Sequence, residues 1–278
     1  MDEAQVPEPP ELHQAVSFGL PLDAFDNLIR AAADIDALWW GRTALFEAVM
    51  TRDHPAALRL VAAGADPWRP QMNGWSPGRL NLAGPEPGLF GPVPAGVGLT
   101  EQEREAVRRS GRLIGTLADL EFDGMSIACV AEIDAAEAIR RLGGRPFEDD
   151  DFDRTVGVTD VAGGCVVAQR AGYTAAAPGV LALLTAGTRG YGMYANPKSG
   201  NQGDSFRDGV MLGSDLHPGG GQAAPDDPAD EVLRIYLYAH QALAYCCDAA
   251  GVEPSDARAF TGPPDAMVRI ADIELWPL

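Results

Sequence analysis

The chain contains few cysteines for its length. Its 278 residues include four, which are Cys129, Cys165, Cys246 and Cys247, and none of them forms a C-x-x-C pair. A small secreted scaffold held together by disulfides needs a denser pattern, and no secretory hydrophobic segment precedes these cysteines. The pattern predicts reduced thiols in a cytoplasmic protein.

Histidines and catalytic motifs are equally sparse. The four histidines, His13, His54, His217 and His240, are scattered, and none pairs with a cysteine at zinc-finger spacing. The glycine-rich stretches match neither a phosphate-binding loop nor a dinucleotide fingerprint, and there is no G-x-S-x-G elbow. We therefore expect no metal, no cofactor and no catalytic residue that the sequence can name.

Cations and long apolar runs are also in short supply. The chain has 21 Lys plus Arg against 40 Asp plus Glu, a formal net charge of −19. Because nucleic acids reward clustered cations, this balance disfavours them as ligands and favours a basic protein partner, although many proteins are acidic without such a role. No apolar run approaches the roughly 18 residues of a membrane span. Residues 1–10, acidic and rich in proline, are expected to be a disordered leader.

What the chain does have is an internal repeat. Residues 11–16 match residues 44–49 at an offset of 33, and Ala33-Asp34 matches Ala65-Asp66 at 32. The start at Thr43-Ala44-Leu45-Phe46 resembles the opening motif of ankyrin repeats, whose period is the same. A degenerate third repeat begins near residue 74. We expect an all-α ankyrin-type domain over 11–122, with a Gly/Pro-rich insert at 84–98 and a capping helix after it.

The pattern changes at residue 123. Residues 125–131 read as a strand, residues 135–142 as a helix capped by Asp134, and residues 155–159 and 164–170 as a hairpin. The glycine-rich stretch 187–209 indicates a second hairpin with a long loop. Residues 217–230 read as loop, 231–250 as the longest amphipathic helix and 267–273 as a closing strand. Strands and helices mix without strict alternation, so we predict a mixed α+β domain over 123–278 with antiparallel hairpins, and an α+β protein overall.

Several short motifs of this second half are similar to an uncharacterised actinobacterial domain family, described as a domain of unknown function. They are the stretch from Ala138 to Pro146, Ala171-Gly172-Tyr173, the stretch from Leu184 to Arg189, Tyr194-x-Asn196, and the late helix with Ala239, Ala242, Leu243 and Gly251. The resemblance covers roughly residues 123–275 and implies a fold without a mechanism. The ankyrin resemblance of the first half implies protein binding.

The hairpins between the repeats carry the strongest functional signal, because ankyrin-like stacks bind through these tips. Four of the five tryptophans lie there, and Trp, Met and Arg are enriched at interface hot spots. We expect at least two of these tryptophans to be buried. The predicted partner-binding residues of the hairpins are Asp36, Trp39, Trp40, Arg42, Trp68, Arg69, Gln71, Met72, Asn73 and Trp75.

A second candidate surface is the acidic run Glu148, Asp149, Asp150 and Asp151, which is either a landing patch for a basic partner or a solvated loop. The leading hypothesis is a protein that acts by stoichiometric binding, in its most specific form an immunity or inhibitor protein against a basic toxin or nuclease. The alternatives are a scaffold or regulatory subunit, and an enzyme with its site near Tyr173, Arg189, Tyr194, Asn196 and the glycine-rich loop. A monomer is favoured.

Overall fold

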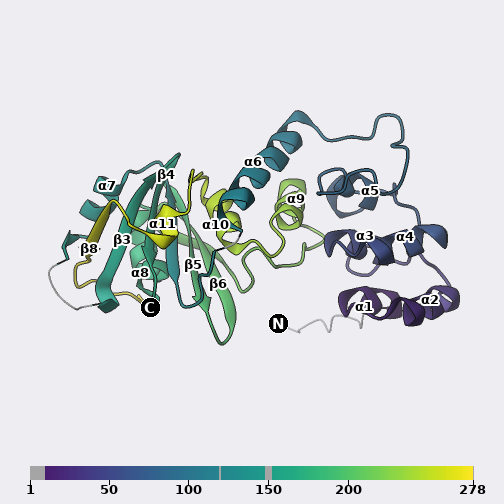
Figure 1. The fold of residues 1–278 in the computed structure, drawn as a ribbon, viewed down its shortest axis with the longest axis horizontal. Coiled ribbons are helices and arrows are strands. Elements are labelled where there is room, and N and C mark those ends of the chain that lie inside the picture. Colours follow the sequence, from purple (N-terminus) through teal and green to yellow (C-terminus); the bar gives the residue numbers. More distant parts are fainter. Residues whose placement is uncertain (1–9, 119, 148–151, 278) are drawn as a thin grey trace. The chain divides into compact units, whose positions relative to one another are not determined.

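The computed structural model describes residues 10–118, 120–147 and 152–277, and the chain forms two compact units (Figure 1). Within the described residues, the first unit contains 10–108 and 222–237, and the second contains 109–221 and 238–277. The two units part within helix α6 (Glu101–Leu117), whereas the predicted domain boundary is residue 122. Residues 222–237 belong to the first unit although they are remote from it in sequence.

The first unit is built from short helices that follow one another in pairs (Figure 1). The pairs are α1 (Glu11–Ser17) with α2 (Leu22–Ala31), and α3 (Ala44–Met50) with α4 (His54–Ala62). A 3₁₀ turn, η1 (Met72–Gly74), and the short helix α5 (Pro77–Asn81) come next, and α9 (Ala229–Leu237) packs against η1. The sequence-predicted helical character of this part is confirmed.

Side-chain caps start three of these helices. Thr43, Asp53 and Ser76 each accept a hydrogen bond from the backbone N–H three residues ahead, which satisfies a donor that the helix itself leaves open. Leu45, Phe46 and Leu60 are completely buried where α3 packs on its neighbours. The first unit is therefore a stack in which α3 lies between α1 and α5.

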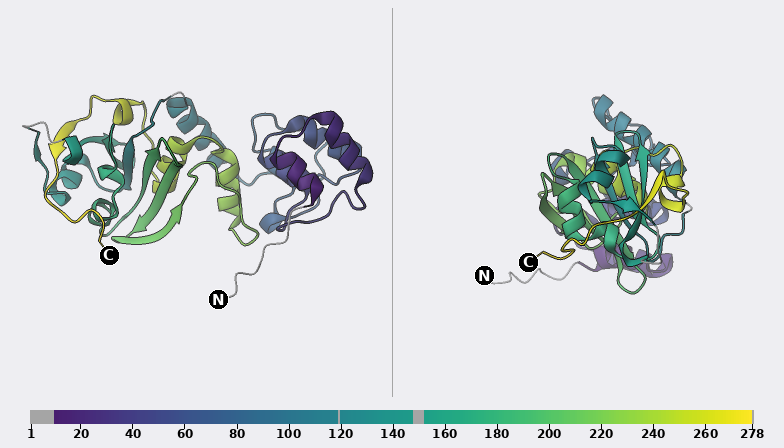
Figure 2. Two further views of the ribbon diagram at one scale, coloured as in Figure 1. Left: turned by 90° about the horizontal axis from the view of Figure 1, so that it is seen from below. Right: turned by 90° about the vertical axis from the view of Figure 1, so that its left-hand side faces the viewer.

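The second unit contains an eight-stranded antiparallel sheet in the order β2-β8-β3-β4-β1-β5-β6-β7. The strands are β1 (Ser126–Ala131), β2 (Arg145–Pro146), β3 (Thr155–Val161), β4 (Gly164–Gln169), β5 (Arg189–Asn196), β6 (Gly200–Arg207), β7 (Val210–Asp215) and β8 (Ala266–Arg269). The central strand β1 is buried along its whole length because helices cover both faces of the sheet (Figure 2).

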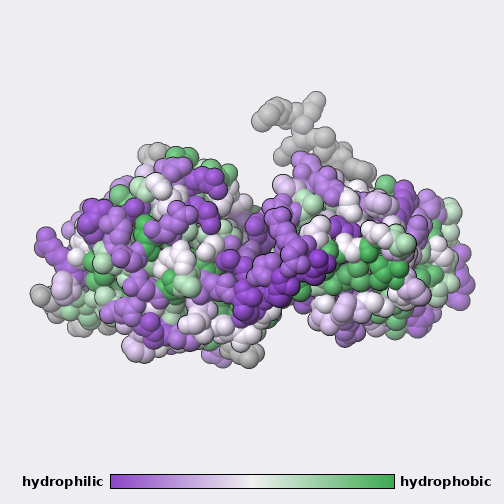
Figure 3. Space-filling view, turned by 90° about the horizontal axis from the view of Figure 1, so that it is seen from above, coloured by the Kyte–Doolittle hydropathy of each residue, from purple (hydrophilic) through white to green (hydrophobic). Residues whose placement is uncertain are grey.

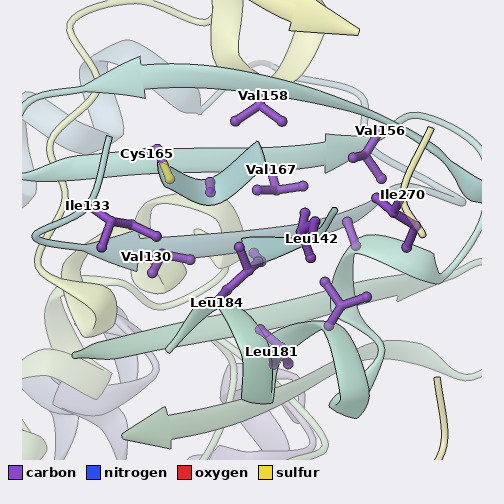
Figure 4. Close-up of a cluster of buried hydrophobic side chains, with 14 of the residues drawn as sticks. Val130, Ile133, Leu142, Val156, Val158, Cys165, Val167, Leu181, Leu184 and Ile270 are labelled. Carbon is purple, nitrogen blue, oxygen red and sulfur yellow. The ribbon is translucent and has the colours of Figure 1, made fainter. Parts of the chain in front are cut away.

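One face carries α7 (Ala135–Arg141) and α8 (Pro178–Leu184), and Figure 4 shows the apolar side chains that fill this layer. Val130, Val158 and Val167 point into it from three strands, opposite Leu181 and Leu184 of α8. The other face carries α10 (Ala242–Ala250) and α11 (Arg258–Thr261). Two packed layers around one sheet give an α+β fold.

Several predicted elements of the second unit are confirmed. The strand at 125–131, the hairpin of β3 and β4, and the helix capped by Asp134 are present, and Gly251 ends α10 with φ 88°. The expected long loop of the second hairpin was wrong, because β5 and β6 pair from Arg189↔Arg207 to Asn196↔Gly200. The glycines there serve packing: a Cβ on Gly192 would stand 2.5 Å from the Leu181 side chain.

The predicted helix at 231–250 was also wrong. It is broken into α9 and α10 at His240, which has φ 62° and donates its backbone N–H to the carbonyl of Gly219. The longest described helix is α6, with 17 residues, and Thr100 with Glu103 forms a capping box at its start. Figure 3 shows hydrophilic residues gathered on α6, where Glu101, Arg104 and Arg108 form ion pairs. Among the described residues, no helix is both long enough and apolar enough to span a membrane.

Candidate functional site

The first predicted hairpin closes at Trp39 and Arg42, whose backbones exchange hydrogen bonds of 2.9 and 3.2 Å. Between them, Trp40 has φ 51° and Gly41 has φ 76°. A tight turn with both central residues at positive φ suits a glycine, but a bulky aromatic residue seldom adopts this conformation. The turn holds Trp40 45% exposed, with its ring centroid 6.2 Å from that of Trp39.

Arg42 turns inward from this hairpin and is 2% exposed. Its Nε lies 2.7 Å from Oε2 of Glu47, which is also buried, and its guanidinium donates to the carbonyl of Ala223 at 2.7 Å and to Gln222 Oε1 at 2.9 Å. A buried cation needs such a set of partners. In this conformation Arg42 is a structural group rather than one that is open to a partner protein.

The second predicted hairpin contributes three side chains to the interior. Gln71, Met72 and Trp75 are all buried, and Trp75 is completely so. The Gln71 side chain accepts from the backbone N–H of Thr43 at 2.8 Å, so it ties the second hairpin to the first. The indole of Trp75 lies under the guanidinium of Arg79, with 4.1 Å between the Arg79 Cζ and the ring centroid.

Residues 222–229 cover much of the surface on which the sequence predicts partner binding. Besides its contacts with Arg42, this segment accepts hydrogen bonds from the Asn73 side chain at the carbonyl of Asp227 and from Trp75 Nε1 at the carbonyl of Ala229, the latter at 2.7 Å. A Cβ on Gly41 would stand 3.1 Å from Pro225. The sequence predicted a loop here but did not predict its contacts with the hairpins. Its two prolines could have indicated an extended stretch with free backbone carbonyls.

The remaining hairpin residues stay accessible. Arg69 and Asn73 are exposed, and Asp36, Trp39 and Trp68 are partly buried. Arg69 donates to the carbonyl of Asp36 at 3.1 Å, and the Asp36 carboxylate accepts from the backbone N–H of Asp66. Of the four hairpin tryptophans, Trp75 alone is fully buried, whereas we expected at least two. Trp40 is the one hairpin tryptophan that is classed as exposed among the described residues.

His13 contacts both ends of the first hairpin and helps to fix its position. Its Nε2 lies 3.0 Å from the carbonyl oxygen of Arg42, and its ring meets Trp39 edge-on with 6.0 Å between centroids. Burial lowers the pKa of His13, although the bond to the Arg42 carbonyl opposes this shift. The imidazole therefore favours its neutral form, and its role is to position the hairpin.

The acidic run Glu148, Asp149, Asp150 and Asp151 lies outside the described residues, so its proposed contact with a partner stays a prediction. No group of three or more His, Cys, Asp or Glu side chains that could hold a metal occurs among the residues that the structure describes.

The residues proposed for an enzyme in the second half make local contacts within the second unit. Arg189 donates to the carbonyl of Ala250 at 3.1 Å, and Asn196 Oδ1 accepts from the backbone N–H of Lys198 at 2.9 Å. Tyr173 and Tyr194 meet edge-on, with 6.5 Å between ring centroids. A cavity of about 280 Å³ lies beneath α11, and its lining is mainly apolar, with Ala168, Ala259, Phe260, Pro264 and Met267.

The four thiols are buried and free. Cys129 and Cys247 have their Sγ atoms 3.9 Å apart, and this contact together with burial raises the pKa of Cys129. Burial raises the pKa of Cys165 to about 12. Since the thiolate is the nucleophile, the raised pKa values keep Cys129 and Cys165 in the unreactive thiol form.

Comparison with known proteins adds nothing to this geometry: no family model matches the chain, and no curated protein matches it either. The two resemblances drawn from the sequence therefore stay predictions.

Proposed function

We propose that this protein acts by stoichiometric binding of another protein, and that its first unit is an ankyrin-type repeat stack. The spacing of the helices supports the repeat: α1, α3 and α5 begin at Glu11, Ala44 and Pro77, which are 33 residues apart. The hydrogen bonds from His13 to the Arg42 carbonyl and between Thr43 and Gln71 join each repeat to the next, as expected of stacked units.

One observation carries the binding proposal. Trp40 occupies a left-handed turn position that costs a non-glycine residue about 1–2 kcal/mol, and it presents nearly half of its surface to solvent there. Backbone strain of this kind tends to persist at functional sites. Trp39 on one side and the Arg42 guanidinium, 5.9 Å from the ring centroid, hold the indole in place before any partner arrives. A preorganised aromatic anchor loses little conformational entropy on binding.

The proposed contact surface is the accessible part of the hairpins, which consists of Asp36, Trp39, Trp40, Trp68, Arg69 and Asn73. The net charge of −19 makes a basic protein the fitting partner, because complementary charge accelerates association. Inhibition of a basic toxin or nuclease is the most specific form of this function. The acidic run Glu148–Asp151 would extend the same charge preference.

The test compares Trp40→Asn with a matched control. Leu58 on α4 is 46% exposed, so Leu58→Ala removes a similar exposed apolar group elsewhere on the first unit. Full-length chains carrying either change are used to capture proteins from the source cell. A basic protein retained at stoichiometric level by the wild type and by Leu58→Ala, but not by Trp40→Asn, is the expected result. Equal capture by all three chains would remove the hairpin from the interaction.

A further inference from the structure

Three aromatic side chains gather on the surface of the second unit, far from the hairpins in sequence. Tyr173 follows β4, Tyr194 lies on β5, and Trp276 lies near the C-terminus marked in Figure 1. The ring centroid of Tyr173 is 6.5 Å from that of Tyr194 and 5.9 Å from that of Trp276. Tyr173 is 49% exposed and Trp276 is 56% exposed. Clustered aromatic rings left in solvent mark an interaction surface more often than scattered ones do.

Two exposed carboxylates belong to the segments that carry or adjoin these rings. The Glu274 side chain accepts from the backbone N–H of Trp276 at 3.1 Å, which fixes an exposed carboxylate at the backbone of this tryptophan. Asp123 is also exposed and precedes Gly124, whose backbone bonds to Gly172 and Ala195, the neighbours of Tyr173 and Tyr194 in sequence.

The nearby cation Arg154 is already engaged. It donates to the carbonyl of Ala271 at 3.1 Å, and its Nε lies 3.6 Å from Asp272. The surface therefore combines aromatic faces with the carboxylates of Asp123 and Glu274. Among the described residues, neither carboxylate forms an ion pair with an arginine.

We propose that Tyr173, Tyr194 and Trp276 form a docking surface for an arginine in a basic segment of a partner protein. Aromatic faces attract a cation through the ring quadrupole, and a guanidinium can stack on a ring while its N–H groups donate to a carboxylate. Glu274 beside Trp276 offers both interactions at one place. This surface does not depend on the function proposed for the hairpins.

The charges favour arginine over other occupants. A second copy of this chain would also bring a net charge of −19, which opposes association across an acidic rim. Lysine carries the same charge but lacks the planar fork, so it should bind more weakly. A neutral peptide would gain neither interaction.

The experiment uses the indole N–H resonances of the full-length, ¹⁵N-labelled protein. The chain has five tryptophans, so Trp40, Trp75 and Trp276 report separately on the hairpin, the buried interior and the proposed surface. The probe is a capped peptide of alternating arginine and glycine. We expect it to shift the Trp276 resonance, with lysine–glycine less effective and glutamine–glycine without effect.

Two variants and a control make the result decisive. Tyr173→Ala and Glu274→Gln should each weaken binding of the arginine peptide by about two- to thirtyfold, whereas Leu212→Ala, at a 64% exposed position on β7, should leave it unchanged. Equal shifts with the glutamine peptide, or a Trp276 resonance that moves no more than that of Trp75, would overturn the proposal. Movement of Trp40 alone would also overturn it, while leaving the hairpin function standing.

Discussion

The indole N–H of Trp75 donates a 2.7 Å hydrogen bond to the carbonyl oxygen of Ala229, although 154 residues separate the two. Trp75 is completely buried, so this bond joins the second hairpin to the segment that returns to the first unit from the far part of the chain. The same segment receives bonds from Arg42 and Asn73. The first unit therefore depends on residues 222–237 for its completion.

Trp75→Phe should lower the stability of the first unit. The ring remains, but the carbonyl of Ala229 loses its buried donor, which costs about 1–3 kcal/mol. Hydrogen exchange across residues 222–237 should accelerate accordingly, since the segment would open more often. Trp276→Phe, at a 56% exposed position, is the control and should leave exchange in this segment unchanged. Unchanged exchange in Trp75→Phe would mean that the bond contributes nothing.

The buried pair of Arg42 and Glu47 predicts a strongly non-additive mutant cycle. Arg42→Met alone leaves the Glu47 carboxylate buried without its cation and should cost about 3–5 kcal/mol of unfolding free energy. Adding Glu47→Leu should recover most of this loss, because no uncompensated charge then remains. Denaturant unfolding of both single variants and the double variant measures the coupling. Additive losses would show that the two side chains act independently.

Trp40→Asn should raise stability while it abolishes partner binding. Asparagine tolerates the left-handed conformation and is preferred before glycine in this turn, so relief of strain should add about 0.5–1 kcal/mol. Trp40→Ala loses the same ring but keeps the strain, and its melting temperature should stay below that of Trp40→Asn. If the two variants melt at the same temperature, the turn is not strained in solution.

His13 makes the first unit sensitive to acid. Burial lowers its pKa below the ordinary value of 6.5, so the unfolded chain binds a proton more readily than the folded one, and unfolding free energy rises with pH across the interval between the two values. Stability should be complete above pH 6.5 and should fall as the pH drops below it. The physical reason is that Nδ1 is buried and has no hydrogen-bond partner among the described residues, so a proton there would be unsatisfied.

The measurement is the melting temperature of the wild type and of His13→Gln at a series of pH values from neutral to mildly acidic. The wild type should lose more stability than the variant over this range, even if the variant starts from a lower value. Parallel curves would assign the acid sensitivity to other groups.

The sequence by itself determined the features that depend on neighbours along the chain. The offset of 33 residues located α1, α3 and α5, and Asp134 started α7 where a capping residue was predicted, because these signals act within a few residues. The hairpin of β3 and β4 followed from two β-rich runs around a short turn. The sequence also located the hairpin that presents Trp40.

The tertiary structure alone decided which hairpin side chains remain accessible. Arg42 and Trp75 have the residue types of an interface, yet residues 222–229 bury them, and no local pattern indicates where that distant segment binds. The break at His240 has the same origin: residues 231–250 carry a helical periodicity, but a backbone bond to Gly219 fixes His240 at φ 62°. Local preference is weak compared with contacts between distant parts of a chain, so burial and helix breaks were settled only when the chain folded.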